Sequence, residues 1–212
     1  DDYMKSFEGA DNIVVVTITG TLSGSYNSAE IAKKIYLEEH PDTKIHVIDS
    51  LSAGGEVDLI VRKLNHLVAE GLDFDQVVDR ITAYQAKTKL LFVLAKVDNL
   101  VKNGRLSKLI GTVVGLLNIR MVGEASKTGT LELLQKARGQ KKAIKAAFDE
   151  LIKAGYTGGH ITIAHRNNDK FIEQFSAMIR EKFAHASIEV LPTSGLCSFY
   201  AEEGGLLMGY EI

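Results

Sequence analysis

The first 85 residues combine short apolar runs with apolar residues at helical spacing. Residues 13–18 and 45–48 are runs rich in β-branched side chains, which predicts buried strands. A loop of Gly, Ser and Thr follows each run, and an amphipathic helix follows each loop. The helical faces are marked by Ile31, Ile35 and Tyr36, then by Val57, Ile60, Leu64, Leu67 and Val68, and then by Phe74, Val77, Val78, Ile81 and Tyr84. This order of elements predicts a parallel α/β sheet.

The pattern changes after residue 85, where the regular alternation of strand, loop and helix is lost. Further strands are predicted at residues 90–94, 119–122, 131–137, 160–164 and 188–191. Helices are predicted at residues 97–101, 109–117, 140–154 and 169–183. We therefore predict an α/β fold of two domains, with a parallel-sheet domain over residues 1–85 and a mixed α/β domain over residues 86–212.

Composition narrows the class of protein without indicating a chemistry. The 212 residues carry a net charge of −2, and 45% of them are hydrophobic, which is the balance of ordinary globular proteins. The charge gives no sign of a nucleic-acid surface, and no apolar run approaches the roughly 20 residues that span a bilayer. A single cysteine, Cys197, excludes an internal disulfide framework, so we expect a cytoplasmic protein. The chain begins at Asp1 without a methionine or a signal-peptide pattern, and we expect its natural start to lie upstream.

Both early strands end in loops whose residue types suit an anion. Backbone N–H groups, hydroxyls and a helix N-terminus, all at the carboxyl end of a parallel strand, can hold a carboxylate or a phosphate. The alternative is that these residues only cap helices and form turns. Neither loop carries the glycine pattern of a dinucleotide site or of a P-loop. The candidate ligand-binding residues are Ser23, Gly24 and Ser25 in the first loop and Ser52, Ala53 and Gly54 in the second.

Other candidate residues are isolated. The histidines lack metal-ligand spacing, so we expect no metal and no cofactor, and His165 at a strand end is interpreted as structural. Cys197 lies beside Ser194 and Ser198 in a predicted loop, where it is either a reactive thiol or a small buried side chain. Ser23 as a hydrolase nucleophile would need a G-x-S-x-G turn, which this sequence lacks.

Four stretches, in this order along the chain, resemble the DegV family. Each is weak alone, but together they cover nearly the whole sequence. They are residues 21–29 (TLSGSYNSA), residues 47–55 (VIDSLSAGG), residues 100–107 (LVKNGRLS) leading to residues 116–120 (LLNIR), and residues 136–143 (KARGQKKA).

The resemblance implies a carrier rather than an enzyme. Members of the DegV family hold a long-chain fatty acid in an apolar tunnel between two domains and present its carboxylate to a fatty acid kinase subunit. Ser23 matches the serine that binds the carboxylate, and Arg105 and Arg138 match arginines that face the kinase. Without the resemblance, both arginines would be read as ordinary solvated side chains. Residues 109–117 are a candidate wall of the tunnel, or alternatively a plain core helix.

The sequence departs from the family pattern at two of the places that bind the carboxylate of the fatty acid. A Thr-Ser loop and about one strand and helix would lie upstream of Asp1, and a C-terminal histidine is absent from residues 192–200. Ser194, Cys197 or Ser198 could take the place of that histidine. We expect no nucleic-acid partner and leave peripheral membrane contact open. The alternatives are an acyl hydrolase or transferase that uses Ser23 or Cys197, and a protein that binds phosphorylated metabolites through its Gly/Ser loops.

Overall fold

The computed structural model describes residues 2–106 and 118–212. The predicted helix at residues 109–117 lies outside the described residues. The first part of the chain has the elements α1 (Asp2–Phe7), β1 (Asn12–Thr17), α2 (Ser25–Glu39), β2 (Lys44–Asp49), α3 (Gly55–Ala69) and α4 (Phe74–Gln85). Strands β1 and β2 pair in parallel, as predicted, with Asn12 opposite Lys44.

The second part forms a larger, mixed sheet. Its elements are β3 (Thr88–Leu94), α5 (Asp98–Lys102), β4 (Ile119–Ala125), β5 (Leu131–Arg138), α6 (Gln140–Lys153), β6 (His160–His165), α7 (Asp169–Lys182), β7 (Ser187–Pro192), α8 (Gly195–Ala201) and β8 (Leu206–Glu211). The strand order is β5-β4-β3-β8-β6-β7. Only β6 and β7 are parallel neighbours within this sheet, and the other pairs are antiparallel. The α/β fold with a small parallel sheet and a mixed sheet is thus confirmed.

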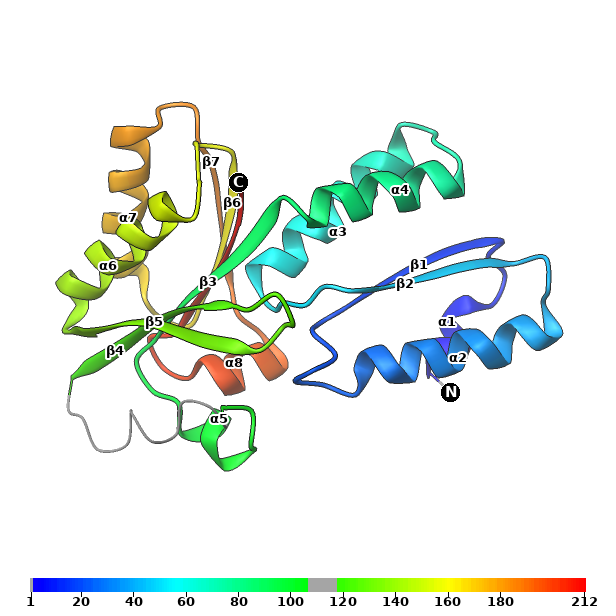
Figure 1. The fold of residues 1–212 in the computed structure, drawn as a ribbon, viewed down its shortest axis with the longest axis horizontal. Coiled ribbons are helices and arrows are strands. Elements are labelled where there is room, and N and C mark those ends of the chain that lie inside the picture. Colours follow the sequence, from blue (N-terminus) through cyan, green and yellow to red (C-terminus); the bar gives the residue numbers. More distant parts are fainter. Residues whose placement is uncertain (1, 107–117) are drawn as a thin grey trace.

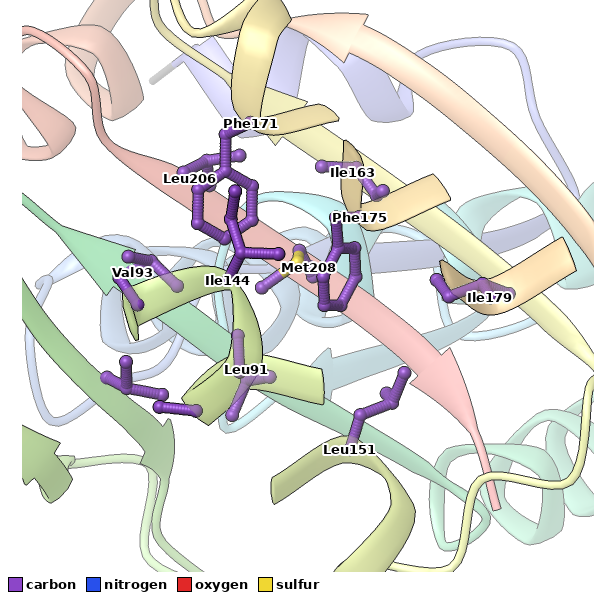
Figure 2. Packing of buried hydrophobic residues seen from close by; sticks show 14 of the residues in the cluster. Leu91, Val93, Ile144, Leu151, Ile163, Phe171, Phe175, Ile179, Leu206 and Met208 are labelled. Carbon is purple, nitrogen blue, oxygen red and sulfur yellow. The ribbon is translucent and has the colours of Figure 1, made fainter. Parts of the chain in front are cut away.

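Alternation along the strands divides the large sheet into two different faces. Leu91 and Val93 of β3 point to one face, where α6 and α7 cover them and form the main core. Figure 2 shows this packing, with Phe171 of α7 lying near Leu206 of β8 and Phe175 lying near Met208. Phe92 and Leu94 of β3 point to the other face, in a separate apolar cluster with residues of α5 and α8.

Helix α3 lies directly on the large sheet although it precedes residue 85 in the chain. A Cβ atom on Gly55 would lie 2.2 Å from the backbone oxygen of Thr162 in β6 and 2.7 Å from the backbone nitrogen of Gly209 in β8. Glycine at position 55 therefore allows the backbone of α3 to lie against the backbones of β6 and β8. In Figure 1, α3 lies between the two-stranded sheet and the large sheet. The two sheets fall on either side of residue 85, whereas the helix packing crosses that division.

Two local predictions need correction. Ile31 and Ile35, expected on the inner face of α2, are exposed, while Ala29, Ala32 and Tyr36 are buried. Both sets have helical spacing, and the small alanines let α2 lie close over β1 and β2. The predicted loop that contains Cys197 is partly helical, because α8 spans Gly195–Ala201.

Candidate functional site

A cavity of about 370 Å³ opens on the face of the large sheet that carries α5 and α8. The loop after β1, the loop after β2, strands β3, β5 and β8, and helices α5 and α8 all contribute to its wall. Its apolar lining comes from Ile18, Leu22, Ala53, Phe92, Leu94, Leu100, Leu131, Leu196, Tyr200, Ala201 and Leu207. Its polar lining comes from Thr19, Ser23, Arg105, Ser194 and Cys197. A mainly apolar cavity with a few convergent polar groups suits a ligand with a long apolar part and one polar group.

The loop after β1 places Ser23 in the cavity wall. Ser23 Oγ accepts a hydrogen bond from the backbone N–H of Ser25 at 3.2 Å, and the Ser23 N–H donates to Thr19 O at 3.2 Å. Gly24 and Ser25 do not line the cavity. Gly24 is the N-cap of α2, and Ser25 Oγ pairs with the Tyr3 hydroxyl at 2.5 Å. Of these three candidates, the structure therefore brings only Ser23 to the cavity.

The loop after β2 contributes mainly its backbone. Ala53 lines the cavity, whereas Ser52 is 1% exposed and does not line it. The carbonyl oxygen of Ser52 accepts a hydrogen bond from the Thr19 N–H at 2.8 Å, which ties the two loops together. Gly54 lines a smaller cavity of about 150 Å³, and a Cβ atom added there would lie 2.7 Å from the Cβ of Leu207. The second loop thus shapes the wall rather than offering a hydroxyl to it.

Ser194 and Cys197 line both cavities, at the start of α8. Burial raises the pKa of the Cys197 thiol, and a hydrogen bond from the backbone of Gly54 partly opposes this shift. The raised pKa favours the neutral thiol over the nucleophilic thiolate. Ser198 does not line the cavity, and its hydroxyl pairs with that of Thr193 at 2.8 Å.

The two candidate arginines lie in different environments. Arg105 lines the cavity, where its Nε donates to Leu22 O at 3.3 Å and its guanidinium lies 5.8 Å from the centre of the Tyr200 ring. Its Nη1 also donates to Asn103 O at 2.6 Å. Arg138 is exposed at the end of β5 and does not line the cavity. The structure therefore places only Arg105 beside Ser23.

Several cavity residues carry no signal in the sequence. Thr19 is 1% exposed, and its loop position alone gives no reason to prefer it over its neighbours. Tyr200 lies on the unpredicted helix α8, and Leu207 on the unpredicted strand β8. His165 Nδ1 accepts a hydrogen bond from the Asn168 N–H at 3.2 Å, which agrees with a structural role. Within residues 2–106 and 118–212, no group of three or more His, Cys, Asp or Glu side chains could hold a metal ion. No helix in that part of the chain is long and apolar enough to cross a membrane.

Known proteins match this chain over nearly its whole length. Residues 2–210 match the family described as uncharacterised proteins of the DegV family. A DegV domain-containing protein of Streptococcus pneumoniae is 77% identical over 212 residues, which are 100% of this chain and 75% of that protein.

Solved structures agree with this match. The crystal structure of the Streptococcus pneumoniae fatty acid kinase B3 protein, loaded with linoleic acid, has a TM-score of 0.97 and 77% identity, covering 100% of this chain and 75% of that one. A DegV family protein from Eubacterium eligens, loaded with heptadecanoic acid, has a TM-score of 0.93 and 40% identity, covering 99% of this chain and 76% of that one. The chain therefore belongs to the DegV family.

Proposed function

We propose that this protein binds a long-chain fatty acid in the 370 Å³ cavity and presents the carboxylate to a partner kinase. The observation that carries the proposal is the distribution of the lining, which is apolar except for a few groups that include Ser23 and Arg105. The Ser23 hydroxyl can donate to a carboxylate, and the Arg105 guanidinium can balance its charge. Relatives of known structure hold linoleic and heptadecanoic acid, which supports the same ligand class here.

The energetics favour a long acyl chain over a short one. Each buried CH2 group contributes about 0.8 kcal/mol, so a long chain in an apolar sleeve gains enough to be retained. A buried carboxylate without partners would cancel much of this gain, which is why hydroxyl or cationic groups must converge on it.

The direct test is to extract the purified protein and identify bound small molecules by mass spectrometry. A fatty acid of about 14 to 18 carbons, in near-stoichiometric amount, is expected on the basis of the per-CH2 gain. Phosphorylated metabolites in place of a fatty acid would overturn the proposal. Protein that carries no acyl chain and fails to take up added oleic acid in a binding assay would overturn it as well.

The enzyme alternative is an acyl hydrolase or transferase using Ser23 or Cys197. Ser23 Oγ is engaged with a backbone N–H rather than with a histidine, and burial raises the pKa of the Cys197 thiol. Both observations favour the carrier. Pure protein should release no acid from acyl esters or thioesters, and sustained hydrolysis that Cys197→Ala or Ser23→Ala abolishes would decide for the enzyme.

Membrane contact beside the cavity forms part of the proposal, because a fatty acid must reach the cavity from a lipid phase. Leu196 and Phe199 of α8 are 55% and 47% exposed, and Leu196 also lines the cavity. We infer a cytoplasmic protein of two domains, residues 1–85 and 86–212, that touches membranes peripherally through α8. Leu196→Ser combined with Phe199→Ser should reduce co-sedimentation with phosphatidylglycerol vesicles, and unchanged co-sedimentation would count against this contact.

A further inference from the structure

The turn between β4 and β5 contacts the loop that carries Ser23. The backbone oxygen of Gly129 accepts hydrogen bonds from Thr19 Oγ1 at 3.0 Å and from Thr21 Oγ1 at 2.7 Å. More than 100 residues separate the partners, since the sequence separations are 110 and 108. In Figure 1, the tip of the β4–β5 hairpin points toward the chain between β1 and α2. One carbonyl thus ties the large sheet to the candidate carboxylate loop.

Thr19 determines the shape of that loop. Its carbonyl oxygen accepts hydrogen bonds from the N–H groups of both Leu22 and Ser23, each at 3.2 Å. Its own N–H donates to Ser52 O at 2.8 Å, and its side chain is buried. A displacement of Thr19 would therefore move the Ser23 backbone and, with it, the direction of the Ser23 hydroxyl.

Gly129 leaves no space for a side chain at this contact. A Cβ atom there would lie 2.0 Å from Thr19 Oγ1 and 3.1 Å from Leu51 Cα, and the residue has a φ of +76°. Both the contact and the backbone conformation require glycine. The turn itself is braced from within, because Ser126 N–H donates to Thr130 O at 2.8 Å and Ser126 Oγ pairs with Thr130 Oγ1 at 2.7 Å. These hydrogen bonds within the turn therefore help to hold the carbonyl of Gly129 toward the two threonines.

We propose that Gly129 and Thr21 are positioning residues, which hold Thr19 and thereby fix Ser23 for recognition of a ligand carboxylate. Neither Gly129 nor Thr21 lines the cavity, so both act through Thr19 rather than by touching the ligand. Because the hairpin belongs to the large sheet, the carboxylate site is complete only when the loop after β1 is docked on that sheet. The inference rests on the proposed fatty-acid ligand and adds the element that sets head-group recognition.

The test compares binding of oleic acid with binding of methyl oleate, which has the same chain but no negative charge. Gly129→Ala should weaken oleic acid binding by about tenfold, the scale of one to two lost hydrogen bonds, while methyl oleate binding changes less than about twofold. Thr21→Val, which removes one donor at nearly constant volume, should weaken oleic acid binding by about threefold. Thr157→Val, the same exchange at an exposed position between α6 and β6, is the matched control and should change neither affinity.

The outcomes separate the two proposals. Equal losses for both ligands would mean that the turn supports only the cavity as a whole, and unchanged affinities would mean that it positions nothing. Either result overturns the inference while leaving fatty-acid binding intact. If Gly129→Ala does not fold, Thr21→Val still decides the question. If the parent protein binds neither ligand, the proposed function is overturned and the inference falls with it.

Discussion

At the scale of single residues, Ser23 is the clearest test of head-group binding. Its hydroxyl oxygen accepts one hydrogen bond from the Ser25 N–H, which leaves its hydrogen available for a ligand in the cavity. Ser23→Ala should therefore weaken fatty-acid binding by about 1–3 kcal/mol, the usual loss for a bond to a charged group. Ser28→Ala, at an exposed position of α2, is the control. Equal affinity for the Ser23 variant and the parent would return Ser23 to a purely structural role at the start of the helix.

Glu56 provides a second test, based on pH. This carboxyl group is 5% exposed, and burial raises its pKa above the ordinary value of 4.5, although hydrogen bonds from the Ser52 and Thr88 side chains oppose the shift. In the folded state the proton is therefore held more tightly than in the unfolded state. Stability contributed by the protonated form is fully present below the unfolded pKa and is lost as pH rises through the folded pKa.

Glu56→Gln should remove this loss. Glutamine keeps an acceptor for the Thr88 hydroxyl, which donates to Glu56 Oε1 at 2.8 Å, but it does not ionise. Between pH 4.5 and the raised pKa, the parent should lose up to about 1.4 kcal/mol of unfolding free energy per pH unit through this group, and the variant should not. Urea unfolding across this pH range would measure the difference. Parallel pH profiles for the parent and the variant would show that Glu56 ionises equally easily in both states.

The sequence identifies some of the site residues and cannot identify others. Ser23 could be predicted because loops after parallel strands meet at one edge of a sheet, and small polar residues there are visible in the sequence. Thr19 and Gly129 could not, because their contact joins positions 110 residues apart and depends on a turn that touches the loop only in the folded chain. Ser52 was expected at the site but faces the protein interior, because its loop presents backbone to the cavity.

At the scale of elements, the backbone of α3 lies close against the backbone of β8. A Cβ atom on Gly209 would lie 2.2 Å from the backbone nitrogen of Glu56, and backbone cannot move aside as a flexible side chain can. Gly209→Ala should therefore cost about 3 kcal/mol of stability, at the upper end of ordinary overpacking. Gly24→Ala, with a φ of −73° and open space around it, should change stability by less than about 0.5 kcal/mol. Urea unfolding of both variants measures this, and similar losses for the two would contradict the close-contact explanation.

The length and regularity of the apolar pattern decide which elements the sequence could predict. Long apolar runs and helices with clear spacing, such as β3 and α3, were predicted because the pattern repeats over several residues. Strand β8 was missed because Gly209 interrupts its apolar run, and the glycine is there to admit α3. Helix α8 was missed because it has only 7 residues, with Gly195, Cys197 and Ser198 among them. Helix α1 was not predicted either and does not line the cavity, whereas α8 and β8 do.

At the scale of the whole molecule, the large sheet separates a structural face from a functional one. Helices α6 and α7 bury one face, and the cavity occupies the other, where the loops after β1 and β2 meet α5 and α8. The site therefore combines residues from both sides of position 85. If a kinase phosphorylates a carboxylate bound in this cavity, we expect it to approach from the cavity face rather than from the face that α6 and α7 cover.

Arg138 is the cleaner probe of such an approach, because it is exposed and does not line the cavity, whereas Arg105 donates to Leu22 O beside Ser23. Arg138→Ala should leave fatty-acid binding unchanged and lower kinase-coupled phosphorylation by about tenfold, since a guanidinium in a water-excluded interface stabilises developing negative charge. Arg105→Ala should reduce phosphorylation by at least as much, with binding measured in parallel to reveal any effect on the loop. Arg180→Ala on α7, exposed on the structural face, is the control and should change neither quantity.

The salt dependence of the coupled assay distinguishes two roles for Arg138. If the guanidinium serves as a docking charge, the loss in Arg138→Ala should appear mainly at low ionic strength and in the kinase concentration needed for half-maximal rate. If it stabilises the acyl phosphate as that forms, the maximal rate should fall at every salt concentration. Phosphorylation at the parent rate in both arginine variants, with binding intact, would show that neither residue faces a kinase, because solvated surface charges contribute little on their own.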